Sequence, residues 1–293
     1  MKKTNRLYQI ILCSVFAVLC VAALYPFLLL VGVSLSDEND IIKYGYQVIP
    51  EKISLEAYKY IFENPASILG AYKTTIIYSA IGTFLSVLLM AMFAYPLTRK
   101  DLPGRKYISF YLYFTMLFNG GLVPSYILNT QYLHLGDTIW IYIIPSLIGA
   151  YSVFMMRSFF QGLPEEMFES MRLDGANHYN IFFGTVLPLS KPVLATVAVT
   201  CFLGKWNDWY TAMIYINKED LISLQYYLQR IMKNIELLQT LEDSTIGMVD
   251  ISQIPAETVR MAMAVVVAGP ALLVFPFFQK YFVRGLTLGS VKG

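Results

Sequence analysis

Two polar stretches interrupt the apolar sequence of this 293-residue chain and carry the residues that could do chemistry. The first is LGKWNDWY at 203–210, where a lysine and an aspartate lie three positions apart among aromatic residues. The second is MRLDGANHYNIFFGTVLPLSKP at 171–192, which combines glycines, prolines, a histidine and several charges. Polar groups at membrane depth are costly and usually line a path, whereas turn-rich polar segments between spans lie at the surface. The first stretch therefore suggests a polar path within the membrane, and the second suggests a segment at the membrane surface.

The composition indicates a membrane protein. Hydrophobic residues make up 56% of the chain and charged residues only 14%, against about 25% charged residues in soluble domains. The net charge of +2 is too small to suggest nucleic acid as a partner. The three cysteines, Cys13, Cys20 and Cys201, all lie in apolar runs, which favours packing roles over a disulfide framework or a metal site.

The apolar runs predict an all-α membrane protein that forms one transmembrane domain over 1–293. A spanning helix needs about 20 mostly apolar residues. Six segments qualify, and the first is too long for a signal peptide and has no small-residue cleavage site. The expected spans are 8–33, 75–97, 107–128, 138–160, 190–216 and 258–283.

Basic residues set the expected orientation in the plasma membrane. Lysine and arginine gather in segments that face the cytoplasm if the N-terminus is inside, as in the run 99–106. With six spans, both termini then lie in the cytoplasm, and so does the polar segment 161–190.

The cytoplasmic segment 161–190 predicts a short surface helix followed by a second one. Pro164 suits a first helical turn, and the following glutamates complement the positive end of the helix dipole. Met167, Phe168 and Met171 then share one face, and Asp174-Gly175 supplies the stop. An exposed apolar face of this kind favours a groove on a partner. The alternative is an ordinary interfacial loop that packs on lipid headgroups.

Two stretches are candidates for a substrate path. In 203–210, aromatic rings beside amide and carboxylate groups suit the apolar faces and hydroxyl edges of a sugar, and Lys205 and Asp208 are expected to pair. The alternative is an interfacial aromatic belt with a structural ion pair. The candidates in this stretch are Lys205, Trp206, Asn207, Asp208, Trp209 and Tyr210.

The other candidate stretch is FNGGLVPSYILN at 118–129. Gly120-Gly121 followed by Pro124 should break or kink the third span. Freed carbonyl groups could then line a path, as in discontinuous transporter helices, although a simple bend for close helix packing explains the pattern equally well. The side chains expected to contribute are Asn119, Tyr126 and Asn129.

The segment EsmrlDGAnhyniFfgtvLPLskP resembles the EAA loop of ABC-importer permeases. The matching positions are Glu169, Asp174, Gly175, Ala176, Leu187 and Pro188, whereas Ser170 and Met171 stand where that family usually has two alanines. FNGGLVPSYI, DTIWIYIIPSLIGAYSVFMMRSFF, KWNDWY and the tail FPFFQKYFVRGLTLGSVKG extend the likeness over nearly the whole chain. They are similar to carbohydrate-uptake permeases of the maltose-transporter type, in particular the lipoprotein-type oligosaccharide permeases of Gram-positive bacteria.

The resemblance implies a type I importer permease that moves a sugar, with an oligosaccharide expected, by alternating access. The implied partners are a second permease subunit, two copies of an ABC ATPase and an extracellular solute-binding lipoprotein. ATP and Mg²⁺ would bind the ATPase subunits, and this chain would bind no cofactor or metal. The residues implied in ATPase coupling are Met167, Phe168, Glu169, Met171, Asp174, Gly175, Ala176, Leu187 and Pro188.

The motifs that would make the chain itself an enzyme are absent from the sequence. It contains no G-x-x-x-x-G-K-[ST], H-E-x-x-H or G-x-S-x-G. The predicted topology places His134 and His178 on opposite sides of the membrane, so they cannot share a site. The rival hypotheses are a permease for an amino acid, peptide or polyol, a membrane scaffold that binds a partner without transport, and a secondary transporter.

Overall fold

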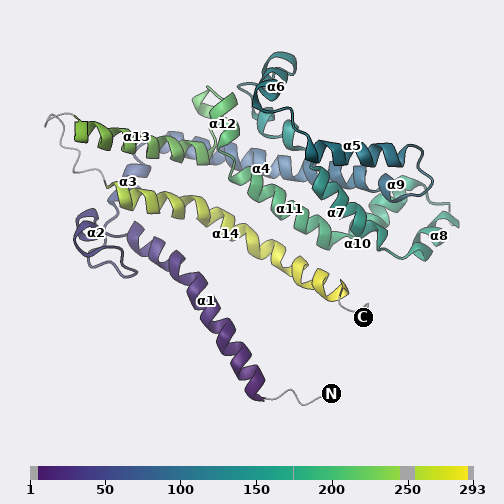
Figure 1. Cartoon of the computed structure of the whole chain (residues 1–293), viewed down its shortest axis with the longest axis horizontal. Coiled ribbons are helices and arrows are strands. Elements are labelled where there is room, and N and C mark those ends of the chain that lie inside the picture. Colours follow the sequence, from purple (N-terminus) through teal and green to yellow (C-terminus); the bar gives the residue numbers. More distant parts are fainter. Residues whose placement is uncertain (1–5, 174, 245–254, 290–293) are drawn as a thin grey trace. The chain divides into compact units, whose positions relative to one another are not determined.

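The computed structural model describes residues 6–173, 175–244 and 255–289, and its regular elements are helices (Figure 1). An isolated antiparallel bridge between Ser36 and Ile53 is the β-type pairing within the described residues. The chain divides into two compact units. The first comprises residues 1–68 and 228–270, and the second comprises 69–227 and 271–293.

The first unit begins with α1 (Arg6–Ser34), a helix whose side chains are almost all exposed and apolar, as expected for contact with lipid. The short helices α2 (Glu38–Tyr44) and α3 (Glu56–Ile61) follow. The unit also holds most of α13 (Leu224–Ser244) and the first part of α14 (Ala256–Gly289).

Glu38 at the start of α2 caps the N-terminus of α14. Its carboxylate accepts hydrogen bonds from the backbone N–H groups of Glu257 and Thr258 at 2.9 and 3.0 Å, and from the Thr258 hydroxyl at 2.8 Å. A negative group is favourable at this end of a helix because it satisfies free N–H donors and complements the dipole. Asp37 caps α2 itself, and its ion pair with Lys52 lowers the pKa of the Asp37 carboxyl.

The second unit holds α4 (Pro65–Ala94) from Leu69 onward and the elements that carry the candidate site residues. The helix α7 lies beside α5 and α11, and α8 and α9 lie at one end of this unit (Figure 1). The α-helices after α4 are α5 (Arg105–Leu117), α6 (Leu122–Ile127), α7 (Ala150–Gln161), α8 (Glu165–Leu173), α9 (His178–Ile181), α10 (Leu187–Leu189), α11 (Lys191–Trp206) and α12 (Tyr210–Tyr215). Short 3-10 or π turns are η1 (Pro96–Thr98), η2 (Leu128–Tyr132), η3 (Ile139–Tyr142), η4 (Ile144–Ser146), η5 (Phe182–Val186) and η6 (Glu219–Leu221).

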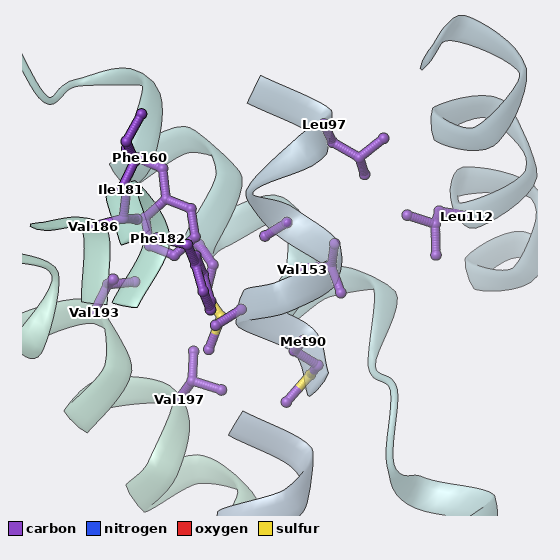
Figure 2. Close-up of a cluster of buried hydrophobic side chains, with 13 residues drawn as sticks. Met90, Leu97, Leu112, Val153, Phe160, Ile181, Phe182, Val186, Val193 and Val197 are labelled. Atoms are coloured by element: carbon purple, nitrogen blue, oxygen red, sulfur yellow. The ribbon is translucent and has the colours of Figure 1, made fainter. Parts of the chain in front are cut away.

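Two buried clusters hold the second unit together. The apolar cluster joins α4, α7, α9–η5 and α11, and Figure 2 shows its side chains pointing toward one another. Its members are Met90, Ala91, Ala94, Leu97, Leu112, Val153, Met156, Phe160, Ile181, Phe182, Val186, Val193 and Val197. The tyrosine cluster consists of Tyr78, Leu135, Ile141, Tyr142, Ile143, Ala212, Ile216 and Ile222.

The structure breaks several of the segments that the sequence predicts as continuous spans. Tyr8–Ser34 and Pro65–Thr98 are long and apolar enough to cross a membrane, and they contain the predicted spans 8–33 and 75–97. Two bent pairs pass the same test jointly: Ile139–Ser146 with Ala150–Gln161, bent by 51°, and His178–Leu189 with Lys191–Trp206, bent by 78°. The described residues thus contain two to four such spans, with α14 as a further 34-residue helix.

The breaks have identifiable chemical causes. The segment 107–128 leaves helical geometry between α5 and α6, at Gly120-Gly121 where a break was expected, and Gly121 adopts a positive φ of 87°. Pro145 and Gly149 fall in the interrupted part of 138–160. The segment 190–216 breaks after Trp206, between α11 and α12.

Candidate functional site

The predicted cytoplasmic helix exists as α8 and ends in a defined turn. Glu165 and Glu166 occupy its first turn and Arg172 its last, which complements the helix dipole at both ends. The Gly175 N–H donates to the Arg172 carbonyl at 3.0 Å, and the Ala176 N–H donates to the Met171 carbonyl at 2.9 Å. This is the Schellman pattern, with Gly175 at φ 79°. Asp174, predicted as part of the stop, lies outside the described residues.

One face of α8 is anchored to the chain's own core. Phe168 and Met171 pack against the apolar cluster, and the Thr185 hydroxyl contacts the Met171 sulfur at 2.9 Å. The chain's own cluster therefore covers part of the face that Phe168 and Met171 share, and contact of the rest of this face with a partner stays a prediction. The spacing of Phe168 and Met171 identifies a shared face, but it cannot tell a face that meets a partner from one that meets the same chain.

The outward side of α8 carries a residue that sequence reasoning missed. Leu173 is 89% exposed, and Glu169 is exposed as well. Met167 lies nearer the core-facing side, but it is still 40% exposed. An isolated leucine on the polar side of an amphipathic helix is the signal that could have revealed Leu173.

The chain after Gly175 passes through short helical turns into α11. Asn177 caps α9 by accepting a hydrogen bond from the Asn180 N–H at 2.8 Å. The predicted second helix is present and runs from His178 to Leu189, with a π turn over Phe182–Val186. Ala176 and Leu187 join the apolar cluster at its edge, and Pro188 is an exposed residue of the first turn of α10.

A polar contact links this segment to the loop after α4. The Arg99 guanidinium lies 2.8 Å from His178 Nδ1 and also pairs with Asp101. Arg99 lowers the pKa of the Asp101 carboxyl to about 2. A cavity of about 630 Å³ opens between this loop and α8, lined by both Arg99 and Phe168.

In the other polar stretch, Lys205 reaches into the tyrosine cluster. Its ammonium donates to the Tyr142 carbonyl at 3.2 Å and to the Ser146 hydroxyl, and the residue is only 7% exposed. Within the described residues it does not form the expected pair with Asp208, whose carboxylate instead accepts from the Thr211 N–H at 2.9 Å. The carboxylate satisfies a free donor at the start of α12, which competes with the lysine for it.

The neighbours of Lys205 explain why a long side chain fits there. A Cβ added at Gly82 would lie 2.8 Å from Lys205 Cε, so the glycine makes room for the lysine. The Tyr78 hydroxyl donates to the Lys205 carbonyl at 2.9 Å, and the Tyr78 and Tyr142 rings stack at 4.2 Å. Lys205 therefore ties α11 to the turns η3 and η4.

The aromatic residues beside Lys205 divide into buried and exposed ones. Trp206 is buried and stacks on Phe202, with 5.7 Å between ring centroids. Trp209 and Tyr210 are exposed and meet edge to face at 5.8 Å. Asn207 is exposed, and its side-chain oxygen accepts from Gln225 at 3.0 Å.

The stretch 118–129 meets α12 through Tyr215, which sequence reasoning did not single out. The rings of Tyr126 and Tyr215 stack at 5.6 Å, and the Asn129 amide donates to the Tyr215 hydroxyl at 3.4 Å. Two of the three predicted residues are thus brought to α12, which follows Trp209 directly. Asn119 is not, because it turns back onto the Gly121 N–H at 2.8 Å.

Comparison with known proteins identifies the family of this chain. The family described as binding-protein-dependent transport system inner membrane component matches residues 64–288. The chain belongs to this family. It is a multi-pass membrane permease of a binding-protein-dependent ABC transport system, and the family is one of transport subunits rather than enzymes.

The permease aligns with its relatives over most of their length. It is 35% identical over 293 residues to the Bacillus subtilis polygalacturonan/rhamnogalacturonan transport system permease protein YtcP, covering 99% of both chains. It is 34% identical to Bacillus subtilis protein LplC, over 92% of this chain and 89% of the relative. The Halalkalibacterium halodurans arabinooligosaccharides transport system permease protein AraQ is 27% identical over 100% of this chain and 99% of its own.

A solved structure supports the fold. The permease superposes on a chain of a bacterial ABC transporter involved in the import of the acidic polysaccharide alginate, with a TM-score of 0.77 and 28% sequence identity. The match covers 96% of this chain and 99% of the other. The resemblance to type I importer permeases noted from the sequence is confirmed. No group of three metal-ligating side chains occurs in the part of the chain that the structure describes.

Proposed function

We propose that this permease imports an oligosaccharide into the cytoplasm as part of an ATP-driven complex. Two of its relatives are named for the transport of polygalacturonan/rhamnogalacturonan and of arabinooligosaccharides, and these names support a carbohydrate cargo. The complex contains a second permease subunit, two ATPase subunits and an extracellular binding protein. ATP and Mg²⁺ bind the ATPase subunits, not this chain.

The permease crosses the membrane six times with both termini in the cytoplasm. The two long apolar helices and the two bent pairs account for four crossings. The interrupted α5–α6 segment and α14 supply the other two. The basic run at 99–106 supports the cytoplasmic side assigned to the loops next to α8.

The geometry of α8 carries the coupling proposal. Its inner face, with Phe168 and Met171, is fixed to the apolar cluster, while Leu173 stands free on the outside. A helix held this way transmits a push from a partner into the transmembrane helices that build the cluster. In this account Leu173, Glu169 and Met167 meet the ATPase, and Phe168, Met171, Ala176 and Leu187 pass its movement on. Gly175 and Pro188 fix the two turns.

The substrate path runs along the aromatic surface near α12. Tyr126, Trp209 and Tyr210 present exposed rings, and sugar rings stack on such surfaces through their C–H faces. Asn207 supplies an exposed amide group near these rings, whereas Asn129 is buried and holds Tyr215. Lys205 and Trp206 lie behind the rings and hold α11 in place. The break between α5 and α6 at Gly120-Gly121 exposes backbone groups that can also line this path.

The test is uptake by the reconstituted complex. Proteoliposomes that hold the permease with its partner subunits are loaded with ATP or ADP on the ATPase side and supplied with the binding protein. They are then offered labelled oligogalacturonides, arabino-oligosaccharides, a dipeptide and a polyol. ATP-dependent accumulation of an oligosaccharide alone is the expected result. Uptake of only the dipeptide or polyol would refute the cargo, and partner binding without any uptake would show a scaffold.

A further inference from the structure

We propose that the cavity at the N-terminal end of α5 binds the phosphate group of an anionic phospholipid headgroup. This cavity, of about 670 Å³, lies within the second unit, between the loop after α4, the start of α5 and α7. It shares Lys100 and Arg105 with the cavity beneath α8, but no residue of α8 lines it. The proposal does not depend on which cargo the complex imports.

The charges around the cavity are of one sign. Four of its lining residues are cationic, and none is acidic: Lys100, Arg105, Lys106 and Arg157. The neighbouring cavity beneath α8 differs, because Asp101 and Glu165 line it together with its basic residues. Asp101, the acid nearest in sequence, is already paired with Arg99. The cavity at α5 therefore lacks a counter-ion from the described part of the chain.

The backbone at the start of α5 and the guanidinium of Arg157 point to the same kind of ligand. Gly104 is the N-cap residue of α5, with a φ of 74°, and no side chain caps this end of the helix. The positive end of the helix dipole therefore faces the cavity. Arg157 donates from Nη1 to the Ser109 hydroxyl at 3.1 Å, but its buried Nε has no hydrogen-bond partner among the described residues. A partly buried, incompletely satisfied guanidinium beside other cations favours an anion with several acceptor oxygens.

The surface of α5 beyond the cavity distinguishes a lipid from a soluble anion. Tyr107 at the cavity is 82% exposed, and a row of exposed aromatic residues continues along the helix. Phe110, Phe114 and Phe118 follow at four-residue spacing, with centroids 6.4 and 4.3 Å apart. An amphiphile can place its phosphate in the basic cavity and its acyl chains along this row. Basic pockets between transmembrane helices on the cytoplasmic side recognise anionic headgroups in this way.

The proposal is tested by lipid retention on the full-length chain. The chain is reconstituted into nanodiscs of equal parts phosphatidylglycerol and phosphatidylcholine, extracted gently, and weighed with its bound lipid by native mass spectrometry. The test variant is Lys100→Gln/Arg105→Gln/Lys106→Gln. The matched control, Lys43→Gln/Lys59→Gln/Lys218→Gln, removes the same charge from exposed lysines elsewhere.

The wild type should retain phosphatidylglycerol in preference to phosphatidylcholine, and the test variant should lose at least about tenfold of it while the control does not. The melting temperatures of the variants show whether the fold is kept. Arg157→Lys, which keeps the charge but removes the planar fork, should give an intermediate loss. Equal retention of both lipids by the wild type, or equal loss in variant and control, would overturn the proposal.

Two further arms separate other sources of the anion. Millimolar inorganic phosphate should reduce lipid retention only weakly, because the phosphate ion has no acyl chain to place on the aromatic row. Complete displacement by inorganic phosphate would show a free-phosphate site instead. If the test variant keeps its phosphatidylglycerol but loses the ATPase subunits from the purified complex, the cavity serves a protein carboxylate and the lipid proposal fails.

Discussion

The two clusters of the second unit are built on different physical principles. The apolar cluster is made of aliphatic and aromatic side chains that lie mostly on α-helices (Figure 2). Phe168 and Met171 of α8 pack against its edge. The tyrosine cluster lies among broken helices and is joined by hydrogen bonds from Tyr78, Tyr142 and Lys205. One cluster is held by dense packing, and the other by a small number of directional contacts.

The difference suggests that the apolar cluster is the rigid part of the permease, next to α8, and that the tyrosine cluster can change conformation near the proposed substrate path. Close-packed side chains resist small displacements and pass them on. Hydrogen bonds around interrupted helices can exchange partners at modest cost, because each net bond contributes only about 0.5–1.5 kcal/mol. If this comparison holds, substitutions in the apolar cluster should mainly cost stability, and those in the tyrosine cluster should mainly alter transport.

The largest stability loss is expected for Phe182→Ala in the apolar cluster. Phe182 is 4% exposed, so its removal leaves a cavity and should cost about 3–5 kcal/mol. Phe183→Ala is the matched control, because that side chain is 49% exposed and should cost far less. Thermal unfolding of the purified chain in detergent measures both. Equal losses for the two variants would mean that the cluster is not the stabilising core.

A smaller effect on stability, with a clear effect on transport, is expected for Lys205→Met. The variant keeps the apolar stem but loses the bonds to the Tyr142 carbonyl and the Ser146 hydroxyl, at a cost of about 1–3 kcal/mol. Lys191→Met, at an exposed position, is the control. ATP-driven uptake should fall for Lys205→Met and stay unchanged for Lys191→Met. A Lys205→Met variant with normal uptake would contradict the idea that the hydrogen bonds of the tyrosine cluster rearrange during transport.

Gly175→Ala tests the turn that ends α8. A side chain at φ 79° is strained by about 1–2 kcal/mol, although the space around the Cβ position of Gly175 is open and no clash arises there. Gly184→Ala has the same open surroundings without the positive φ and should be nearly neutral. Thermal unfolding compares the two, and indistinguishable midpoints would argue against a fixed turn at Gly175.

The smallest effect concerns the loop between α4 and α5, which contacts α9 through Arg99 and His178. Because the pKa of Asp101 is lowered to about 2, its pairing with Arg99 contributes stability that is complete above the unfolded pKa near 4. That contribution is lost as the pH falls through about 2. Asp101→Asn should therefore show a slightly shallower loss of stability with acid than the wild type. Identical pH profiles by circular dichroism would remove any role for the pair.

Local patterns predicted local structure well. The charges and turn residues of 165–176 identify an amphipathic helix and its glycine stop, because those signals act within one or two helical turns. Gly120-Gly121 likewise marks the break before α6. Such features depend on neighbours in the sequence and can be recognised without a tertiary structure.

The long-range side-chain contacts could not be predicted from the sequence. Nothing in the spacing of Phe168 and Met171 shows that their face packs on the same chain. The i, i+3 spacing of Lys205 and Asp208 favours an ion pair, but Lys205 instead binds the Tyr142 carbonyl in η3 and Asp208 binds the Thr211 N–H in α12. Tyr215 gathers Tyr126 and Asn129 across a gap of more than 80 residues. These contacts are set by how segments meet in space, which pattern alone does not encode.

The central claim is that the exposed side of α8 connects this permease to its ATPase, and Leu173→Asp tests it most directly. The substitution adds a charge to a side chain that is 89% exposed, so it leaves the apolar cluster untouched. Leu237→Asp places the same change on another exposed leucine, on α13. Co-purification of the ATPase and ATP-driven uptake are measured for both. The account predicts that both are lost for Leu173→Asp and kept for Leu237→Asp, whereas a Leu173→Asp permease that retains its ATPase and transports normally would contradict it.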